Sequence, residues 1–286
     1  MKQVKDIIKY VLNNGVERQT RTGEVISAWN YQASWDIRDD FPAVTSKTLA
    51  WKPVVGELLW FLSGSKSLSD LRKLTYGSDQ NQWTIWNGDT ERWLTNKSYT
   101  DKNFVGDLYP TQWRNYNGGG VDQIQNLISN IIENPLERDH IVMAWNPEAI
   151  HRDLMALKPC HLGFQCYITN NGELNLHWWQ RSVDVFLGLP FNIASYSLLA
   201  HLLANWCNLR VGTVSCTLMD VHIYVDHMDS VNKYMSNIEY PMPKLILPKG
   251  CETFEDTLNL TAIDFKDCLY QYESAGEIKA PLSVGS

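Results

Sequence analysis

Five polar or ionisable residues lie close together in an otherwise apolar part of the chain. They occur within the thirteen residues from 180 to 192, and they are Gln180, Arg181, Ser182, Asp184 and Asn192. Their neighbours are mostly valine, leucine and phenylalanine, which a solvated surface would not carry. A buried donor or acceptor that lacks a partner costs about 1–3 kcal/mol. We therefore expect these side chains to pair with one another or with a flat, polar ligand.

Cys160 is the candidate nucleophile, because it precedes this cluster and lies between Pro159 and His161. A cysteine taken alone is more often an inert core residue than a catalytic one. The thiolate is the form that attacks, and a nearby guanidinium such as that of Arg181 would favour it. The residues alone leave two interpretations open, a thiolate nucleophile and a buried structural thiol.

Glu57 and Asn192 each allow two interpretations. Glu57 lies in VVGELLWFL on the same helical stripe as Val54 and Phe61, so its carboxylate either turns outward at the helix edge or is buried with a raised pKa. A buried glutamate would serve as a general acid and base. Asn192 lies in LPFNIASY, where it either caps the following helix or presents its amide to a ligand. An amide that both donates and accepts matches uracil, whose edge offers O4 as acceptor and N3–H as donor.

Three runs of this sequence closely resemble the active-site core of the thymidylate synthase family. They are QRSVDVFLGLPFNIASY at 180–196, PCH at 159–161 and ELLWFL at 57–62. The resemblance extends over nearly the whole chain and is weakest between residues 66 and 108. It implies a folate-dependent transferase in which the thiolate of Cys160 adds to C6 of dUMP.

The resemblance also implies the other catalytic residues. Glu57 would act through water on O4 and C5 of the pyrimidine, and Tyr109, in DLYPTQWR, would assist removal of the C5 proton. Asn192 would select uracil over cytosine. Asp184 belongs to the same catalytic set and would also meet the pterin of the folate.

A substrate site for dUMP follows from the same resemblance. Arg21 and Arg181 would bind the phosphate together with Arg138, whose counterpart in relatives reaches into the partner subunit's site. A homodimer would then be required for activity. His222 and Tyr224, in DVHIYVDH, would bind the 3′-hydroxyl of the sugar. The rest of the expected substrate-binding set is Gln180, Ser182, Asp184 and Asn192.

The second substrate implied is 5,10-methylenetetrahydrofolate, and no metal is expected. Asp184 would meet its pterin, and the apolar and aromatic walls around it are expected from Trp86, Leu187, Gly188 and Phe191. Lys47 lies where the glutamate tail of the folate would pass. Ser283, in IKAPLSV at 278–284, holds the penultimate position of a C-terminal tail that folds over the ligands in the family.

The sequence departs from the family pattern mainly at the phosphate end of the site. Asp139 stands where most relatives have a second arginine, and the loss of one charge-assisted bond could cost about 1.5–3 kcal/mol. The glycine-rich loop after Arg21 is reduced to Thr22-Gly23-Glu24-Val25. Further departures are Asn87 in place of an aspartate, Val221 in place of a threonine, and Gly285 and Ser286 after the usual last position.

Two other functions stay open at this point. A hydroxymethyltransferase relative would add water to the methylene intermediate and give 5-hydroxymethyl-dUMP and tetrahydrofolate, whereas a thymidylate synthase adds hydride and gives dTMP and dihydrofolate. The outcome depends on how well the site excludes water. A catalytically idle nucleotide-binding or structural relative is the third hypothesis, which Asp139 favours and the complete catalytic set opposes. The intact run DVFLGLPFN favours the synthase.

Composition limits the class of protein. A chain of 286 residues with 44% hydrophobic content can bury a large core. The formal net charge of −7 opposes general nucleic-acid binding, which needs a basic surface. The six cysteines form no CxxC pair or metal-ligand pattern, and no apolar run approaches the ~20 residues of a membrane span. Because the N-terminus also lacks a secretory pattern, we expect a cytoplasmic protein without a membrane partner.

The spacing of apolar residues predicts the elements that would position the site. Helices are predicted over residues 4–12, 53–62, 121–132 and 193–207. Strands are predicted over 141–145, 162–168 and 173–179, the last two joined by a turn at Asn170-Asn171-Gly172. Residues 66–108 have weak periodicity and are interpreted as a variable insertion or long loops. One α+β catalytic domain over 1–286 is expected, with a large mixed β-sheet flanked by helices.

Overall fold

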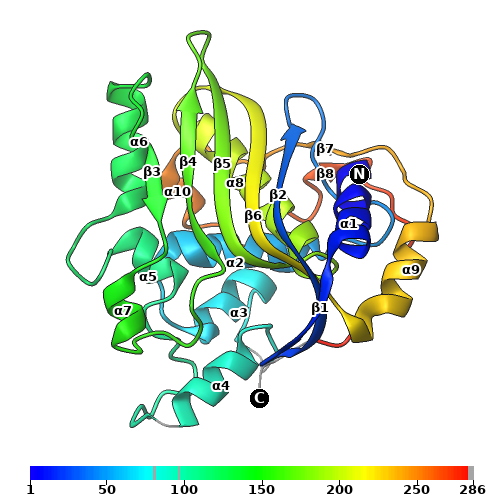
Figure 1. The fold of residues 1–286 in the computed structure, drawn as a ribbon. Coiled ribbons are helices and arrows are strands. Elements are labelled where there is room, and N and C mark those ends of the chain that lie inside the picture. The colour runs from blue at the N-terminus through cyan, green and yellow to red at the C-terminus, as the bar shows by residue number, and fades with distance from the viewer. Residues whose placement is uncertain (80–81, 96, 283–286) are drawn as a thin grey trace.

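The computed structural model describes residues 1–79, 82–95 and 97–282. Within these residues a six-stranded sheet with the strand order β1-β2-β6-β5-β4-β3 forms the centre of the molecule (Figure 1). The strands are β1 (Val16–Thr20), β2 (Gly23–Asp36), β3 (Ile141–Met143), β4 (His161–Ile168), β5 (Glu173–Asp184) and β6 (Arg210–Tyr224), with β7 (Lys244–Leu245) and β8 (Leu269–Tyr270) as a separate pair. Because β5 and β6 are parallel and the other neighbours antiparallel, the predicted mixed sheet is confirmed.

Helices flank this sheet. They are α1 (Lys2–Asn14), α2 (Trp51–Ser63), α3 (Leu68–Tyr76), α4 (Asn87–Thr95), α5 (Tyr109–Arg114), α6 (Gln123–Glu133), α7 (Pro147–His151), α8 (Gly188–Trp206), the 3-10 helix η1 (Val225–His227), α9 (Met228–Ser236) and α10 (Phe254–Thr257). The four predicted helices correspond to α1, α2, α6 and α8. None of the helices described has the length and apolar character needed to cross a membrane.

Residues 66–108 contain two helices, α3 and α4, which the weak periodicity of this region did not predict. Ser67 caps α3 by accepting a hydrogen bond from the backbone N–H of Ser69 at 3.2 Å. α3 packs on α2 and buries Leu71, and α4 buries Trp93. The interpretation as long loops is therefore wrong for these two segments, because such short helices have too few turns to give a clear period.

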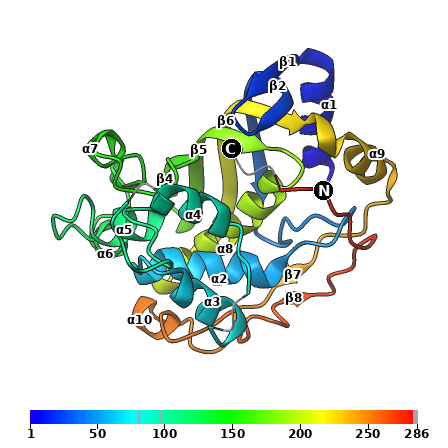
Figure 2. The same ribbon diagram turned by 90° about the horizontal axis from the view of Figure 1, so that it is seen from below.

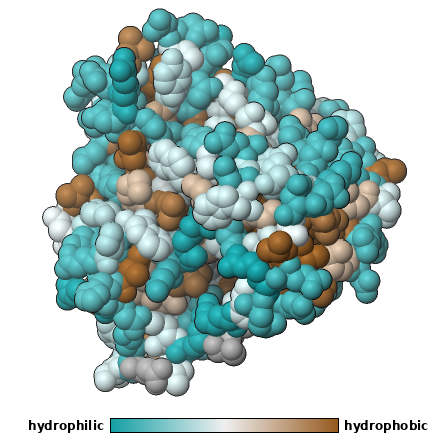
Figure 3. All heavy atoms as spheres, in the orientation of Figure 1, coloured by the Kyte–Doolittle hydropathy of each residue, from teal (hydrophilic) through white to brown (hydrophobic). Residues whose placement is uncertain are grey.

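The two faces of the sheet differ in what covers them. Helices α2 and α8 lie on one side of the sheet (Figure 2), and Leu176 and Trp178 of β5 are buried there. On the other face Tyr167 is 63% exposed, and His177 and Trp179 are half-buried. In Figure 1 the strands lie in front of α2 and α8, so the half-exposed face of the sheet is turned to the viewer. Figure 3, in the same orientation, shows hydrophobic (brown) and intermediate (white) residues among hydrophilic ones on this face.

Strand register brings the predicted site residues to one end of the sheet. Because β5 and β6 are parallel, Asp184 pairs with His222 where both strands end. β4 runs in the opposite direction and begins at His161, which pairs with Gln180 of β5. The chain then enters α8 shortly after β5, so the first turns of α8 return to the same place.

Candidate active site

Cys160 precedes β4 and lies beside Arg181 of β5. The backbone N–H of Arg181 donates to the Cys160 carbonyl at 2.8 Å, and its guanidinium lies 3.9 Å from Sγ. The same guanidinium donates to the carbonyl groups of Pro159 at 2.8 Å and Lys158 at 2.9 Å, which fixes its position. Burial raises the pKa of the Cys160 thiol, and the positive charge of Arg181 opposes that increase. The charge that favours the thiolate is therefore already in place.

Tyr109, at the start of α5, connects the nucleophile to the surrounding core. Its hydroxyl oxygen accepts hydrogen bonds from the backbone N–H groups of Cys160 at 2.7 Å and His161 at 3.1 Å. Its ring stacks on Phe61 with the ring centroids 4.7 Å apart. Burial raises the pKa of Tyr109 well above its usual value. The phenol therefore stays neutral, and its own hydrogen is available to a further partner.

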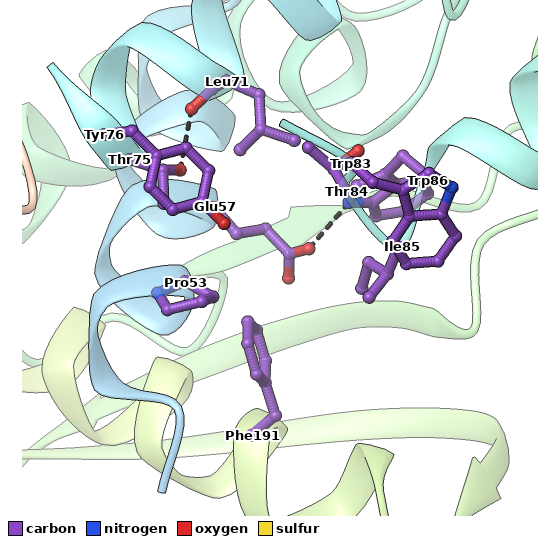
Figure 4. A pocket seen from close by; sticks show the side chains of 10 residues that line it. All are labelled: Pro53, Glu57, Leu71, Thr75, Tyr76, Trp83, Thr84, Ile85, Trp86 and Phe191. Carbon is purple, nitrogen blue, oxygen red and sulfur yellow. Dashed lines mark hydrogen bonds between the residues drawn. The ribbon is translucent and has the colours of Figure 1, made fainter. Parts of the chain in front are cut away.

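Glu57 is buried, so the alternative of a carboxylate at the helix edge is wrong. The indole N–H of Trp86 donates to its Oε2 at 2.7 Å, and burial raises the pKa of Glu57 to about 7. Figure 4 shows Phe191 of α8 pointing towards this carboxylate. Both aromatic side chains and Ile85 line a cavity of about 110 Å³ next to Glu57. A carboxyl group with this pKa can donate and accept a proton near neutral pH.

Asn192 belongs to a buried chain of amides, not to a helix cap. Leu187 is the N-cap residue of α8, so the capping interpretation of Asn192 is wrong. The Gln180 amide donates to Asn192 Oδ1 at 3.1 Å, and the Trp178 indole N–H donates to the side-chain Oε1 of Gln180 at 3.1 Å. Gln180 also donates to the Ser182 carbonyl at 3.0 Å. These bonds fix the orientation of the Asn192 amide before any ligand binds.

Asp184 shapes the turn between β5 and α8. Its Oδ1 accepts hydrogen bonds from the backbone N–H groups of Phe186 at 2.8 Å and Leu187 at 3.1 Å, which sets the position of Leu187 and Gly188. The Lys47 ammonium donates to the Phe186 carbonyl at 2.6 Å. Burial lowers the pKa of Lys47 to about 8, and Asp184 opposes this decrease. Lys47 thus supports the turn directly.

His222 and Tyr224 lie near the end of β6, facing the turn between β1 and β2. His222 Nδ1 lies 3.1 Å from Asp220 Oδ1, and the hydroxyl groups of Tyr224 and Thr22 lie 2.8 Å apart. Arg21 in this turn is exposed, and its charge opposes the increase that burial causes in the pKa of Tyr224. The two residues predicted to bind sugar and one predicted to bind phosphate are thus brought to the same corner.

Arg138, which was predicted to bind the phosphate, is not brought into this site within one chain. Arg138 and Asp139 are exposed in the loop between α6 and β3, at the far edge of the sheet from the β1–β2 turn. The Arg138 carbonyl accepts a hydrogen bond from Gln165 at 2.8 Å, which holds the loop on β4. Ser283 lies outside the described residues.

Three residues that support the site were not singled out from the sequence. Asp220 accepts hydrogen bonds from Ser27 at 2.9 Å and Arg18 at 2.8 Å, and the interaction with His222 lowers its pKa to about 2. Its position two residues before His222 in one strand was the available signal, because such residues share a face. His227 lies in DVHIYVDH and Gly56 in VVGELLWFL, but the roles of both depend on contacts with distant segments.

Comparisons with known proteins agree with this geometry. The family model described as thymidylate synthase matches residues 2–284. The probable thymidylate synthase of Escherichia phage T5 is 46% identical over 284 residues, covering 99% of this chain and 100% of the relative. The thymidylate synthase of Enterobacteria phage T4 is 42% identical over 248 residues, covering 86% of this chain and 85% of the relative.

The fold agrees as well. The crystal structure of thymidylate synthase from T4 phage matches with a TM-score of 0.90 and 39% sequence identity, covering 99% of this chain and 100% of that chain. The predicted α+β fold, one domain with a large mixed sheet flanked by helices, is confirmed.

Proposed function

The chain belongs to the thymidylate synthase family, and from this premise we propose how its side chains carry out the reaction. The enzyme is a folate-dependent methyltransferase that converts dUMP to dTMP, with 5,10-methylenetetrahydrofolate as second substrate and dihydrofolate as second product. One observation carries the assignment of roles. The Trp86 indole donates a hydrogen bond to Glu57, and the ring centroids of Trp86 and Tyr109 are 6.0 Å apart. The Tyr109 hydroxyl in turn accepts a hydrogen bond from the backbone N–H of Cys160.

Cys160 acts as the nucleophile. Its sulfur adds to C6 of the pyrimidine, and the electron pair of the C5–C6 double bond moves towards C5 and O4. The Arg181 guanidinium 3.9 Å from the sulfur favours the thiolate over the thiol. Substrate phosphate would share this guanidinium, so binding of dUMP and activation of the thiol are linked through one side chain.

Glu57 and Tyr109 manage protons. Glu57 has a pKa of about 7, so it can donate a proton towards O4 through water and later take one back. Tyr109 assists removal of the C5 proton after the carbon has been transferred. Its oxygen already accepts two backbone hydrogen bonds, which hold the ring beside the nucleophile.

Recognition of dUMP divides between the base and the sugar phosphate. Asn192 recognises uracil with an amide that Gln180 holds in position, and Ser182 contributes from the same strand. His222 and Tyr224 bind the 3′-hydroxyl. The phosphate is bound by Arg21 and Arg181 of one subunit together with Arg138 of the other.

The folate supplies the one-carbon unit and then the hydride. The residues present suit such a ligand, because an aromatic ring fits between apolar walls and a pterin needs a polar contact. We assign the walls to Trp86, Leu187, Gly188 and Phe191, and the polar contact to Asp184. Lys47 supports this turn through the Phe186 carbonyl and lies beside the path of the glutamate tail, and Ser283 belongs to the closing tail.

We also propose a homodimer in which the half-exposed sheet face is the subunit interface. Tyr167, His177 and Trp179 would be covered there, and Arg138 would reach the partner's site. The position of the Arg138 loop at the opposite edge of the sheet from the Arg21 turn supports this proposal. A reducing cytoplasmic compartment suits the chain, because the six cysteines are free thiols.

Product identification tests this function. The full-length chain is mixed with dUMP and methylenetetrahydrofolate, and both products are identified by mass. We expect dTMP and dihydrofolate in equal amounts. A mixture that contains mainly 5-hydroxymethyl-dUMP, with no dihydrofolate, would establish the hydroxymethyltransferase instead, and no product would favour the idle relative.

A further inference from the structure

His227 lies between the C-terminal segment and the turn that carries Asp184. Its side chain is fully buried, with 0% exposure. One ring nitrogen, Nε2, lies 2.7 Å from the Pro281 carbonyl oxygen, and the other, Nδ1, lies 3.8 Å from Asp184 Oδ2. Among the described residues no other side chain has polar contacts with both segments, and the imidazole therefore joins the tail to the expected folate site.

The C-terminal segment is anchored at several points before it reaches His227. The Gly276 carbonyl accepts a hydrogen bond from the Thr48 N–H at 2.9 Å, and the Lys279 carbonyl accepts one from the Ser230 hydroxyl at 2.7 Å. Figure 2 shows the red segment passing α9 on its way towards the centre of the molecule. His227 is the last of these anchors along the described chain.

The hydrogen-bond roles of the imidazole follow from its partners. A carbonyl oxygen only accepts, so Nε2 carries the hydrogen that Pro281 receives. The Asp226 carboxylate, 3.7 Å from Nε2, favours the same arrangement. Neighbouring rings hold the imidazole in place, with centroids 5.9 Å away for Phe186 and 5.2 Å away for Tyr224.

The other side of the imidazole is unsatisfied. Nδ1 is buried and has no hydrogen-bond partner among the described residues, and 3.8 Å is too long for a direct bond to Asp184. The second oxygen of Asp184, Oδ1, is already bonded to two backbone N–H groups. With Nε2 protonated, Nδ1 and Oδ2 are two acceptors that converge on one position. A group that offers two hydrogens would satisfy both of them.

We propose that His227 is a positioning residue that couples docking of the C-terminal tail to folate binding at Asp184. This inference rests on the proposed function. The pterin edge carries an N–H and an amino group side by side, and a water that accepts a hydrogen bond from this edge offers its own two hydrogens to Nδ1 and Oδ2. The imidazole contacts both the tail, at Pro281, and the position between Nδ1 and Asp184 Oδ2. Docking of the tail therefore holds the imidazole in the orientation that folate binding needs.

Two substitutions of His227 separate its two contacts. In His227→Gln the amide nitrogen reaches the position of Nε2 and keeps a donor for Pro281, but the group facing Asp184 is lost. In His227→Asn the amide remains near Asp184, but the tail contact is lost. Ser230→Ala is the matched control, because it removes another hydrogen bond to the tail and does not touch Asp184.

Binding of tetrahydrofolate in the presence of dUMP is the measurement, because this pair does not react. We expect His227→Asn to weaken tetrahydrofolate binding about tenfold, as for the loss of one buried hydrogen bond, and to leave dUMP binding within about twofold. His227→Gln should also weaken tetrahydrofolate binding, but the tail should stay protected from carboxypeptidase because its contact with residue 227 is kept. Ser230→Ala should change tetrahydrofolate binding less than about twofold.

A double-mutant cycle decides whether the tail is involved. In a chain that ends at Ala280, His227→Asn should have little further effect on tetrahydrofolate binding. The coupling would be overturned if His227→Asn lowered the affinity for tetrahydrofolate equally in the full-length and shortened chains. It would also be overturned if neither His227 variant changed this affinity in the full-length chain. If His227→Asn does not fold, His227→Gln is measured in both chains with the same two outcomes. Failure of the unsubstituted enzyme to bind tetrahydrofolate with dUMP would instead count against the proposed function.

Discussion

The two ends of the dUMP site are built in opposite ways. At the catalytic end Tyr109, Glu57 and Asn192 are 3%, 7% and 9% exposed, and each is held by a hydrogen bond to another part of the chain. At the phosphate end Arg21 and Arg138 are exposed, and they lie at opposite edges of the sheet. The catalytic end is held together within a single chain, whereas the phosphate end, as proposed above, is completed by a second chain and the ligand.

Physical chemistry explains this difference. Proton transfer near neutral pH requires altered pKa values, and burial supplies them, raising the pKa of Glu57 to about 7. A guanidinium keeps its charge at any exposure, so a phosphate site gains little from burial. Two of the departures from the family pattern, Thr22 to Val25 and Asp139, fall at the phosphate end, whereas Asn87 follows Trp86 at the catalytic end. We infer that sequence change is tolerated at this end because Arg21, Arg138 and Asp139 are exposed.

The largest expected effect comes from removing the nucleophile at the catalytic end. Cys160→Ser should reduce the turnover number by about 10⁴-fold or more, and it should abolish the covalent adduct with 5-fluoro-dUMP and folate. The fold should be unaffected, because serine is similar in size. Cys166→Ser is the control, since Cys166 is buried in β4 and has no role in the reaction. An adduct that survives in Cys160→Ser, or that maps to Cys166, would contradict the assignment.

Neutralising Glu57 should have the next largest effect. Glu57→Gln keeps an acceptor for the Trp86 indole but cannot transfer a proton, so the turnover number should fall about 10²–10⁴-fold. Binding of dUMP should change little. Glu24→Gln provides a matched control, because Glu24 is an exposed glutamate near the phosphate end. Equal effects of the two substitutions would remove the distinction between the two ends.

The same substitution should stabilise the protein at high pH. The pKa of Glu57 is about 7 in the folded chain and near 4.5 when unfolded, so the folded chain holds more protons between these values. The free energy of unfolding therefore falls as pH rises through this window, by about 3 kcal/mol in total. Glu57→Gln should match the unsubstituted chain near pH 4.5 and exceed it by about this amount at pH 8. Urea unfolding of both chains at the two pH values measures the difference in the free energy of unfolding. A difference that does not depend on pH would contradict this prediction.

Base recognition should give a smaller change. Asn192→Asp reverses one hydrogen bond to the pyrimidine, which should shift the preference from dUMP towards dCMP by about 1–3 kcal/mol in kcat/KM. The Gln180 amide can still donate to the new carboxylate, so the fold should persist. Competition between the two nucleotides measures the ratio. If the ratio does not change, another group recognises the base.

The helices with a clear apolar period and the strands of the β4–β5 hairpin could be predicted from the sequence, but β1, β2 and β6 were not. β2 shows why. Asn30 has a positive φ of 59° and is left out of the pairing with β6, so the alternation that marks a strand is interrupted. Trp29 before Asn30 is 72% exposed although it is a large apolar residue, which also hides the pattern. The interruption is visible only once the partner strand is known.

The site residues could be identified, but their environments could not. The sequence allowed Glu57 to be either exposed or buried, because the decision depends on contacts with α3 and with Trp86. Gly56 lets α3 approach so closely that a Cβ there would lie 2.0 Å from Thr75 Oγ1. The Cys160–Arg181 contact depends likewise on strand register across β4 and β5. Such long-range contacts leave no mark on the local sequence.

The smallest expected effect lies at the phosphate end and tests its tolerance of change. Asp139 is exposed beside Arg138, and its negative charge should weaken the phosphate site proposed for Arg21, Arg181 and Arg138. Asp139→Arg should therefore tighten dUMP binding a few-fold, about the size of an exposed charge interaction, and the gain should shrink as salt is raised. Titration of dUMP by calorimetry at two salt concentrations measures this, with Asp139→Asn as the control that removes charge without adding any. A loss of affinity would show that Asp139 orients Arg138, and the phosphate end would then be as finely arranged as the catalytic end.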